Sequence, residues 1–388
     1  MVWRLLRPGR LTKLILTVSF LLTAKALAFP EMVRHGYVHC NACHTTVVGG
    51  HLLNDYGRSL SRELLSEKSL FGKTSTEGDE AVAFGLAPEV PWLKWGGDVR
   101  LLQSFVESRQ ASKGRFIIMQ MDFDFLASVT DQLKSFFSIG RLEPKASEAT
   151  ARDFVYIPRF GLEWNFANGG SETEQMGARV GRFMPAYGIA FAEHTFVTRS
   201  FLNFGTGQER LAADFHWLND TYSVIATAIW GQAKGLQNEF EQGGIIQVAS
   251  AIGQKSKVGG NFYQSTRKQN DQSYTQTVSG LFAHWGISEQ AYALIELDQM
   301  KTANQTTGML DALKLGYEAR QGLHVFLTQE FANLDVSKGD PKFEAFGLGT
   351  QWFPRPHWDL YAVYRRERNT AVDLDGQDVI WLVGHFYL

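Results

Sequence analysis

The sequence predicts an all-β transmembrane barrel of about 16 antiparallel strands, preceded by a small α-helical N-terminal segment. Three observations predict this fold. Apolar and polar residues alternate from about residue 95 to the end. Short and long connections follow one another between the alternating segments. No apolar run reaches the roughly 18 residues that a membrane-spanning helix needs.

The composition narrows the class further. Hydrophobic residues at 44% and charged residues at 20% exclude a disordered chain. Two cysteines in 388 residues exclude a disulfide-dense scaffold. The formal charge is −2, and no basic patch indicates a nucleic-acid partner.

Residues 1–28 have the organisation of a secretory signal peptide. Basic residues precede an 11-residue, largely apolar stretch over residues 14–24, and Ala26 and Ala28 supply small residues for cleavage before Phe29. The alternative is a membrane anchor, for which the apolar stretch is too short. Cleavage removes five Lys and Arg and no acid, which brings the formal charge to −7.

The two cysteines lie in the motif Cys40-Asn41-Ala42-Cys43-His44. In an exported protein such a pair of thiols forms a disulfide unless the thiols are bonded to another group. The C-x-x-C-H spacing is the attachment signature of a c-type haem, because two thiols on one helical turn reach both vinyl groups and the adjacent His44 becomes the proximal iron ligand. A thioredoxin-type disulfide would need a βαβ context, which is not visible. We therefore expect one covalent haem c, attached at Cys40 and Cys43.

The distal ligand has several candidates near the motif: Met32, His35, His39 and His51. His39 abuts Cys40, so we expect the attached turn to point it away. His35 is followed by Gly36, which permits the chain to fold back, and His51 follows a Gly-Gly pair that also permits a reversal. We favour His35 as the distal ligand, and a five-coordinate iron stays open.

The motif belongs to a monohaem cytochrome c segment that we place at residues 29–71. Apolar residues at helical spacing over 53–65 predict one amphipathic helix that covers a haem face. Residues 72–95 are rich in Gly, Ser, Thr and Glu, contain Pro88 and Pro91, and read as a linker.

The barrel is expected over residues 96–388. In one segment Phe123 and Phe125 alternate with Asp122 and Asp124, and each segment is about the 9–11 residues that a tilted strand needs to cross a bilayer. The strands are expected to start near residues 96, 115, 132, 152, 174, 209, 221, 240, 255, 271, 287, 306, 321, 342, 357 and 377. Pro158 in the fourth strand marks a bulge or a later start.

Most connections from even to odd strands are short, and most from odd to even strands are longer. Barrels in the outer membrane of Gram-negative bacteria have short periplasmic turns and longer outer loops, so we expect both ends of the mature chain in the periplasm. The connection over 185–208 is long enough to fold inward as a constriction. Polar residues expected to face a wet or plugged lumen are Asp98, Arg100, Asp122, Asp124, Arg159, Glu163, Asp214, His216, Glu296, Asp298, Lys314, Glu318, Glu330, Asp359 and Arg365.

An exported chain with a haem motif before a barrel resembles the fused monohaem cytochrome c–porin family of outer-membrane iron oxidases. Arg34 before the motif and Tyr56-Gly57-Arg58 after it are similar to family positions as well. The resemblance implies thioethers at Cys40 and Cys43, proximal His44, and an electron conduit between periplasmic cytochromes and an extracellular donor such as Fe(II). His35 to His39 differ from close members, so an extracellular acceptor stays open.

Two other functions compete with the conduit. One is a solute porin whose haem segment is a periplasmic appendage. The other is a peroxidase-like enzyme, which needs distal acid and base groups that nothing in the sequence specifies. A barrel of this size leaves an open interior, and residues 29–95 are long enough to plug it in part. Conductance therefore separates a plugged conduit from an open porin.

Overall fold

A computed structural model describes residues 29–50, 52–67, 90–109, 111–141, 157–166, 174–191, 193, 195–205, 207–232, 240–269, 272–302, 306–338, 343–370 and 376–388. The expected signal peptide, His51 and residues 72–89 of the expected linker lie outside the described residues. None of the helices that the structure describes is long and apolar enough to cross a bilayer.

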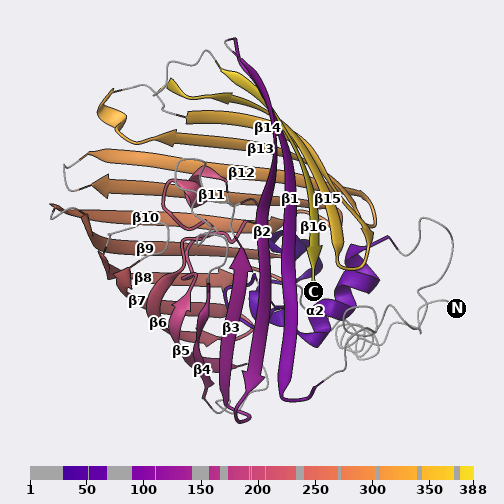
Figure 1. Ribbon diagram of the computed structural model, residues 1–388, viewed down its shortest axis with the longest axis vertical. Coiled ribbons are helices and arrows are strands. Elements are labelled where there is room, and N and C mark those ends of the chain that lie inside the picture. The colour runs from indigo at the N-terminus through magenta and orange to yellow at the C-terminus, as the bar shows by residue number, and fades with distance from the viewer. Residues whose placement is uncertain are drawn as a thin grey trace, which may run out of the picture.

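Sixteen strands form one closed antiparallel barrel, as predicted (Figure 1). Each strand pairs with its neighbours in sequence, and β1 and β16 pair with each other to close the ring. The strands are β1 (Leu93–Glu107), β2 (Ser112–Ser128), β3 (Leu133–Arg141), β4 (Phe160–Asn165), β5 (Gln175–Phe183), β6 (Arg210–Leu218), β7 (Tyr222–Gln232), β8 (Phe240–Ala251), β9 (Ser256–Gln269), β10 (Gln272–Gly286), β11 (Ala291–Thr302), β12 (Thr307–Arg320), β13 (Leu323–Asn333), β14 (Phe343–Arg355), β15 (Trp358–Arg368) and β16 (Gln377–Tyr387).

Two strands start four or more residues later than predicted, each for a local reason, whereas the other strands start within three residues of the predicted positions. In the described residues β4 begins at Phe160 and not near 152, shortly after Pro158, which has no N–H for a strand ladder. β11 begins at Ala291 and not near 287, because residues 287–290 form a turn that the Ile287 N–H closes by donating to the Ala291 carbonyl at 2.9 Å.

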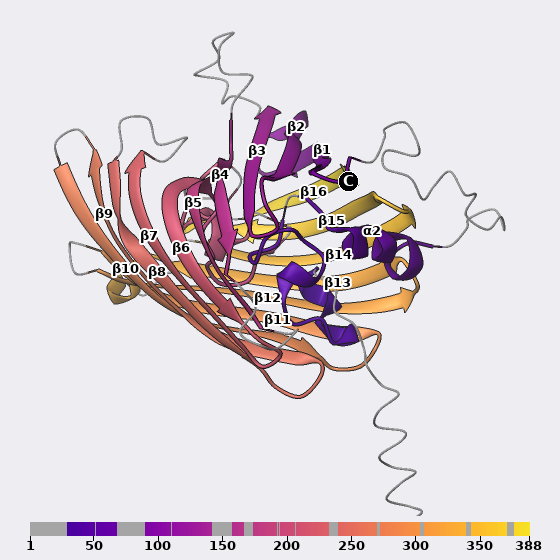
Figure 2. The same ribbon diagram turned by 90° about the horizontal axis from the view of Figure 1, so that it is seen from below.

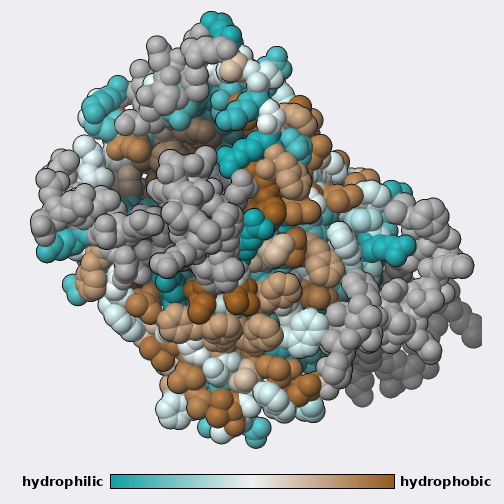
Figure 3. Space-filling model, viewed as in Figure 1, coloured by the Kyte–Doolittle hydropathy of each residue, from teal (hydrophilic) through white to brown (hydrophobic). Residues whose placement is uncertain are grey.

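The outer surface of the barrel is apolar and the lumen is polar. On β2, Phe123 is 49% exposed, whereas Asp122 is fully buried and Asp124 is 4% exposed. Figure 3 shows apolar side chains gathered over the strands on the outside. Every residue predicted to face inward is buried or partly buried. An apolar belt around a polar interior is the arrangement of a barrel that spans a membrane.

Residues 29–67 lie inside the barrel at the end that carries the short turns (Figure 2). Their elements are η1 (Pro30–His35), η2 (Cys40–Ala42), α2 (Asp55–Leu60) and η3 (Ser61–Leu65). Arg34, which is fully buried, pairs with Glu318 of β12 at 2.8 Å, and the Ser61 and Tyr387 hydroxyls hydrogen-bond at 3.0 Å. The segment therefore plugs one mouth of the barrel, as its length suggested.

The connection between β5 and β6 also enters the lumen, as expected, and carries the short helix α3 (Val197–Ser200). The Tyr187 hydroxyl donates to Asp298 at 2.6 Å, and the Ile189 and Val197 amides donate to Glu296 and Glu330, each at 2.9 Å. Inward carboxylates on the strands thus satisfy backbone amides of this inward loop. We use "inward loop" below for the described residues between Met184 and Glu209.

Candidate functional site

The haem motif forms a tight turn. In η2 the amides of Cys43 and His44 both donate to the Cys40 carbonyl, at 3.2 and 3.0 Å. No disulfide joins Cys40 and Cys43 in the structure. Asn41 donates to Gln175 of β5 at 2.7 Å and so fixes the turn to the barrel wall.

Asn54 holds this turn against α2. Its side-chain amide donates to the carbonyls of Asn41 at 3.2 Å and Ala42 at 2.9 Å, and its side-chain oxygen caps α2 by accepting from the Gly57 amide at 2.8 Å. Sequence reasoning did not identify Asn54, although an Asn before a helical pattern is a recognised capping signal.

Two glycines let the chain approach the motif closely. A Cβ on Gly57 would lie 2.3 Å from the Cys43 carbonyl oxygen, so α2 packs on the motif only with glycine there. Gly49 has φ +73°, and a Cβ there would lie 3.3 Å from the Cys40 sulfur. The space beside Cys40 thus depends on glycine at this position.

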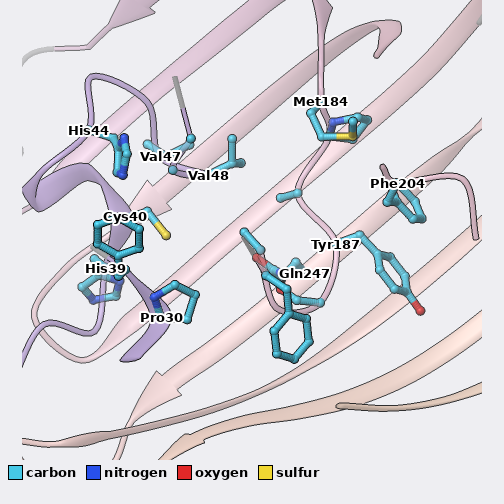
Figure 4. A pocket seen from close by; sticks show the side chains of 18 of the residues that line it. Pro30, His39, Cys40, His44, Val47, Val48, Met184, Tyr187, Phe204 and Gln247 are labelled. Atoms are coloured by element: carbon cyan, nitrogen blue, oxygen red, sulfur yellow. Dashed lines mark hydrogen bonds between the residues drawn. The ribbon is translucent and has the colours of Figure 1, made fainter. Parts of the chain in front are cut away.

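A cavity of about 230 Å³ lies between the N-terminal segment, the barrel wall and the inward loop. Cys40 and His44 line it at one side, and Met184 and Tyr187 line it from the inward loop (Figure 4). Ordinary small-molecule pockets hold about 300–1,000 Å³, so this cavity is smaller than an ordinary ligand pocket.

The motif fits a haem in part. Cys40 and His44 face the cavity directly. Cys43 does not line it: the side chain is 3% exposed and packs in a cluster with Met32 and Leu60. Phe29 and Tyr37 pack on that cluster and line the cavity in its place. Attachment at both thiols therefore requires Cys43 to reach the cavity past these rings.

The structure separates the candidate distal ligands. His35 lines a different pocket, beside Glu289 and Glu318, and burial, with a smaller effect of Arg34, lowers its pKa to about 4. Met32 is fully buried in the Cys43 cluster. The structure does not bring His35 to the cavity that Cys40 and His44 line, and its role as distal ligand stays a prediction.

His39 lies elsewhere than expected. It lines the same cavity as Cys40, so the turn does not point it away. Burial lowers its pKa to about 4, and the nearby Lys257 acts in the same direction, so its imidazole is neutral at ordinary pH. A neutral imidazole on the cavity is a possible iron ligand in chemical terms.

Two wall residues beside the motif were not identified from sequence. Lys257 on β9 and His284 on β10 are direct cross-strand partners, and both line the cavity. Alternation along β9 could have placed Lys257 on the inner face. Its position opposite Cys40 depends on where the N-terminal segment docks, which no local pattern encodes.

Known proteins match this chain in structure only. No model of a protein family matches it, and no curated protein matches it. The solved structures that it resembles include the outer membrane channel DcaP of Acinetobacter baumannii (9% identity, TM-score 0.54, 76% of this chain and 97% of that chain covered). A loop-deletion mutant of OmpT of Vibrio cholerae is 14% identical with a TM-score of 0.55, and the match covers 76% of this chain and 99% of that chain. An anion-selective porin from Comamonas acidovorans is 12% identical with a TM-score of 0.53, with 76% of this chain and 99% of that chain covered.

At these identities the likeness concerns the fold. The chain has the closed 16-stranded barrel of outer-membrane porins. Together with the apolar belt, this fold places it in the outer membrane of a Gram-negative bacterium, in contact with lipid.

Proposed function

We propose that this chain is an outer-membrane electron conduit with one covalent haem c, attached at Cys40 and Cys43 and ligated by His44. The observation that carries the proposal is the position of the motif: Cys40 and His44 face a cavity inside the lumen of a barrel. When bound, the haem supplies a one-electron carrier. The conduit would exchange electrons with periplasmic cytochromes on one side and an extracellular donor or acceptor, with Fe(II) the first candidate, on the other.

The protein's own part is to seat and insulate that carrier. The apolar band of such a barrel is about 25 Å tall. Residues 29–67 fill one mouth, and the inward loop narrows the middle of the lumen. Asn41 and Asn54 hold the attachment turn against the wall and α2, so the cavity and the motif keep one geometry.

Covalent attachment tests the first half of the proposal. Replacement of Cys40 and Cys43 by Ala should abolish haem staining of the denatured protein, while the barrel still inserts and resists protease in membranes. Staining that survives the double replacement would exclude haem c.

Electron transfer tests the second half. Fe(II) added to the purified wild-type protein in detergent should reduce its haem, which is followed by the absorbance change of a c-type haem. A haem that is present and reducible by dithionite, but not by Fe(II), would remove Fe(II) as the donor.

The second candidate is a solute porin with an appended haem segment, which the likeness to porins favours. The contacts of the plug count against a wide pore. Lys314, which is 1% exposed, binds Glu31 of the N-terminal segment at 3.1 Å and Glu193 of the inward loop at 2.7 Å. We expect low, sporadic conductance in planar bilayers. Steady conductance of large, uniform steps would favour the porin.

A further inference from the structure

Lys257 differs from the other buried cations on the barrel wall. Its residue is 8% exposed, and in the part of the chain that the structure describes no carboxylate lies within ion-pair distance of it. The other buried wall cations each have such a partner there: Arg159 has Asp122 and Asp124, Arg179 has Asp214, Arg210 and Arg267 have Glu241, Lys314 has Glu31 and Glu193, and Arg365 has Glu330.

The uncompensated charge lies beside the haem motif. Lys257 lines the cavity with Cys40, and Cys40 and His39 are within electrostatic range of it. His284 is its cross-strand partner, so the two side chains are neighbours on the inner face. The groups around Lys257 are thus a thiol and two imidazoles, none of which supplies the full negative charge of a carboxylate.

Burying a cation without a counter-charge costs free energy. The protonated Lys257 side chain would act on the cavity through its field. In a medium of low dielectric constant that field extends over several ångströms, and salt screens it weakly. A positive charge at Cys40 disfavours one more positive charge on an iron bound at His44. The reduced state, which carries one positive charge less, is favoured relative to the oxidised state.

We propose that the positive charge of Lys257 raises the reduction potential of the haem at Cys40, Cys43 and His44. Lys257 is thus a positioning residue that acts on the haem through its electric field. The inference rests on the haem attachment proposed above. A raised potential suits a carrier that accepts electrons from a weak reductant.

Neutral and charge-conserving variants test this role. Lys257→Met and Lys257→Gln remove the charge with similar length, and Lys257→Arg keeps it. In the detergent-purified full chain, haem staining of the denatured protein comes first and spectroelectrochemical titration second. The midpoint potential should shift to more negative values in Lys257→Met and Lys257→Gln and stay close to wild type in Lys257→Arg.

Lys255→Met is the matched control. Lys255 stands two residues earlier, and its side chain is 37% exposed beside Glu289. The Lys255→Met substitution removes the same formal charge at the same end of the barrel. Water and salt screen the charge of Lys255, so the midpoint potential of the haem should stay at the wild-type value. The shift of the Lys257 variants should persist at high ionic strength.

The outcomes separate the two proposals. No covalent haem in the wild type would refute the haem conduit itself. Covalent haem with the wild-type midpoint in Lys257→Gln, or with a positive shift, would overturn the role of Lys257 and leave the conduit standing. An equal shift in Lys255→Met would also overturn it, because the effect would then follow net charge and not the buried position. If the Lys257→Met protein does not insert into the membrane, the midpoint potential of Lys257→Gln, which keeps a hydrogen-bond donor, tests the role of Lys257.

Discussion

The N-terminal segment and the inward loop both fill the lumen, but they are held in different ways. The inward loop continues into strands at both ends, and the wall satisfies its amides and buries its aromatic rings, with Tyr187 and Phe204 stacked at 4.6 Å between ring centroids. The N-terminal segment joins the barrel at one end only and docks through side chains, chiefly Arg34 on Glu318 and Glu31 on Lys314. The inward loop is thus fixed firmly to the wall. The N-terminal segment is a plug that single substitutions can loosen.

The sidedness of the plug is the largest effect to test, because it is all or none. Tags inserted in 334–340 or 369–376 should be reached by antibody on intact cells, and tags at 219–220 or 286 should be reached only after the outer membrane is opened. The reason is the alternation of short and long connections. The reverse pattern would put the plug at the outer mouth.

Lys314→Met should loosen the plug most among single substitutions. It leaves Glu31 and Glu193 buried without their shared cation, and loss of one partner of a buried pair costs about 3–5 kcal/mol. Conductance in planar bilayers should rise and the midpoint of denaturant unfolding should fall. Lys338→Met is the control: that side chain is 71% exposed, and its loss should change stability by less than about 0.5 kcal/mol. Unchanged conductance in Lys314→Met would mean that the plug does not depend on this pair.

Tyr187→Phe should cost less and leave the pore closed. It removes the hydroxyl that donates to Asp298, which costs about 1–3 kcal/mol for a buried acceptor left without its donor. Because strands hold the inward loop at both ends, conductance should stay at the wild-type level. A rise like that of Lys314→Met would show that the loop is no more secure than the plug.

Asn54→Ala should weaken the plug from within. The loss of an N-cap costs about 0.5–2 kcal/mol, and here the carbonyls of Asn41 and Ala42 also lose their donor. Limited proteolysis should cut within 29–67 faster than in wild type. Asn333→Ala removes a similar turn contact, to the Asp335 amide at 2.9 Å, at the end of β13 far from the plug, and should leave that cleavage rate unchanged. Equal rates in both variants would deny Asn54 its role.

Replacement of the sixth ligand of the iron should have the smallest effect on the structure, and the absorption spectrum of the haem should report it clearly. His35→Ala should keep its covalent haem, because Cys40, Cys43 and His44 remain, and should lose low-spin character and bind cyanide or carbon monoxide more readily. In His39→Ala the spectrum should match wild type. The opposite result in the two proteins would assign the position to His39, which lines the cavity.

The barrel was predictable because its rules are local. Alternation needs only neighbouring residues, and it placed the start of β16 at Gln377 and that of β6 within one residue of Arg210. It failed at β4, where Pro158 interrupts the pattern. The inward face was predictable for the same reason.

Local sequence indicated the candidate site only where a motif lies in consecutive residues. C-x-x-C-H singles out Cys40 and His44, which both line the cavity, and the haem attached there stays a prediction. The neighbourhood of Lys257 and the separation of His35 from the cavity both depend on how the plug docks across the barrel. Such contacts between distant parts of the chain follow from packing and charge pairing, and neither has a signature in one stretch of sequence.

The seam between β1 and β16 bears on the order in which the protein is assembled. It joins the two ends of the barrel sequence, and Leu388 donates its amide to the Gly97 carbonyl at 2.9 Å. Chain entropy makes such a pairing the slowest to form. The plug touches both seam strands, through Ser61 on Tyr387 and Arg58 on the Trp95 carbonyl. A segment that is already compact can guide the two seam strands together, so the plug can act as a template for closing the ring.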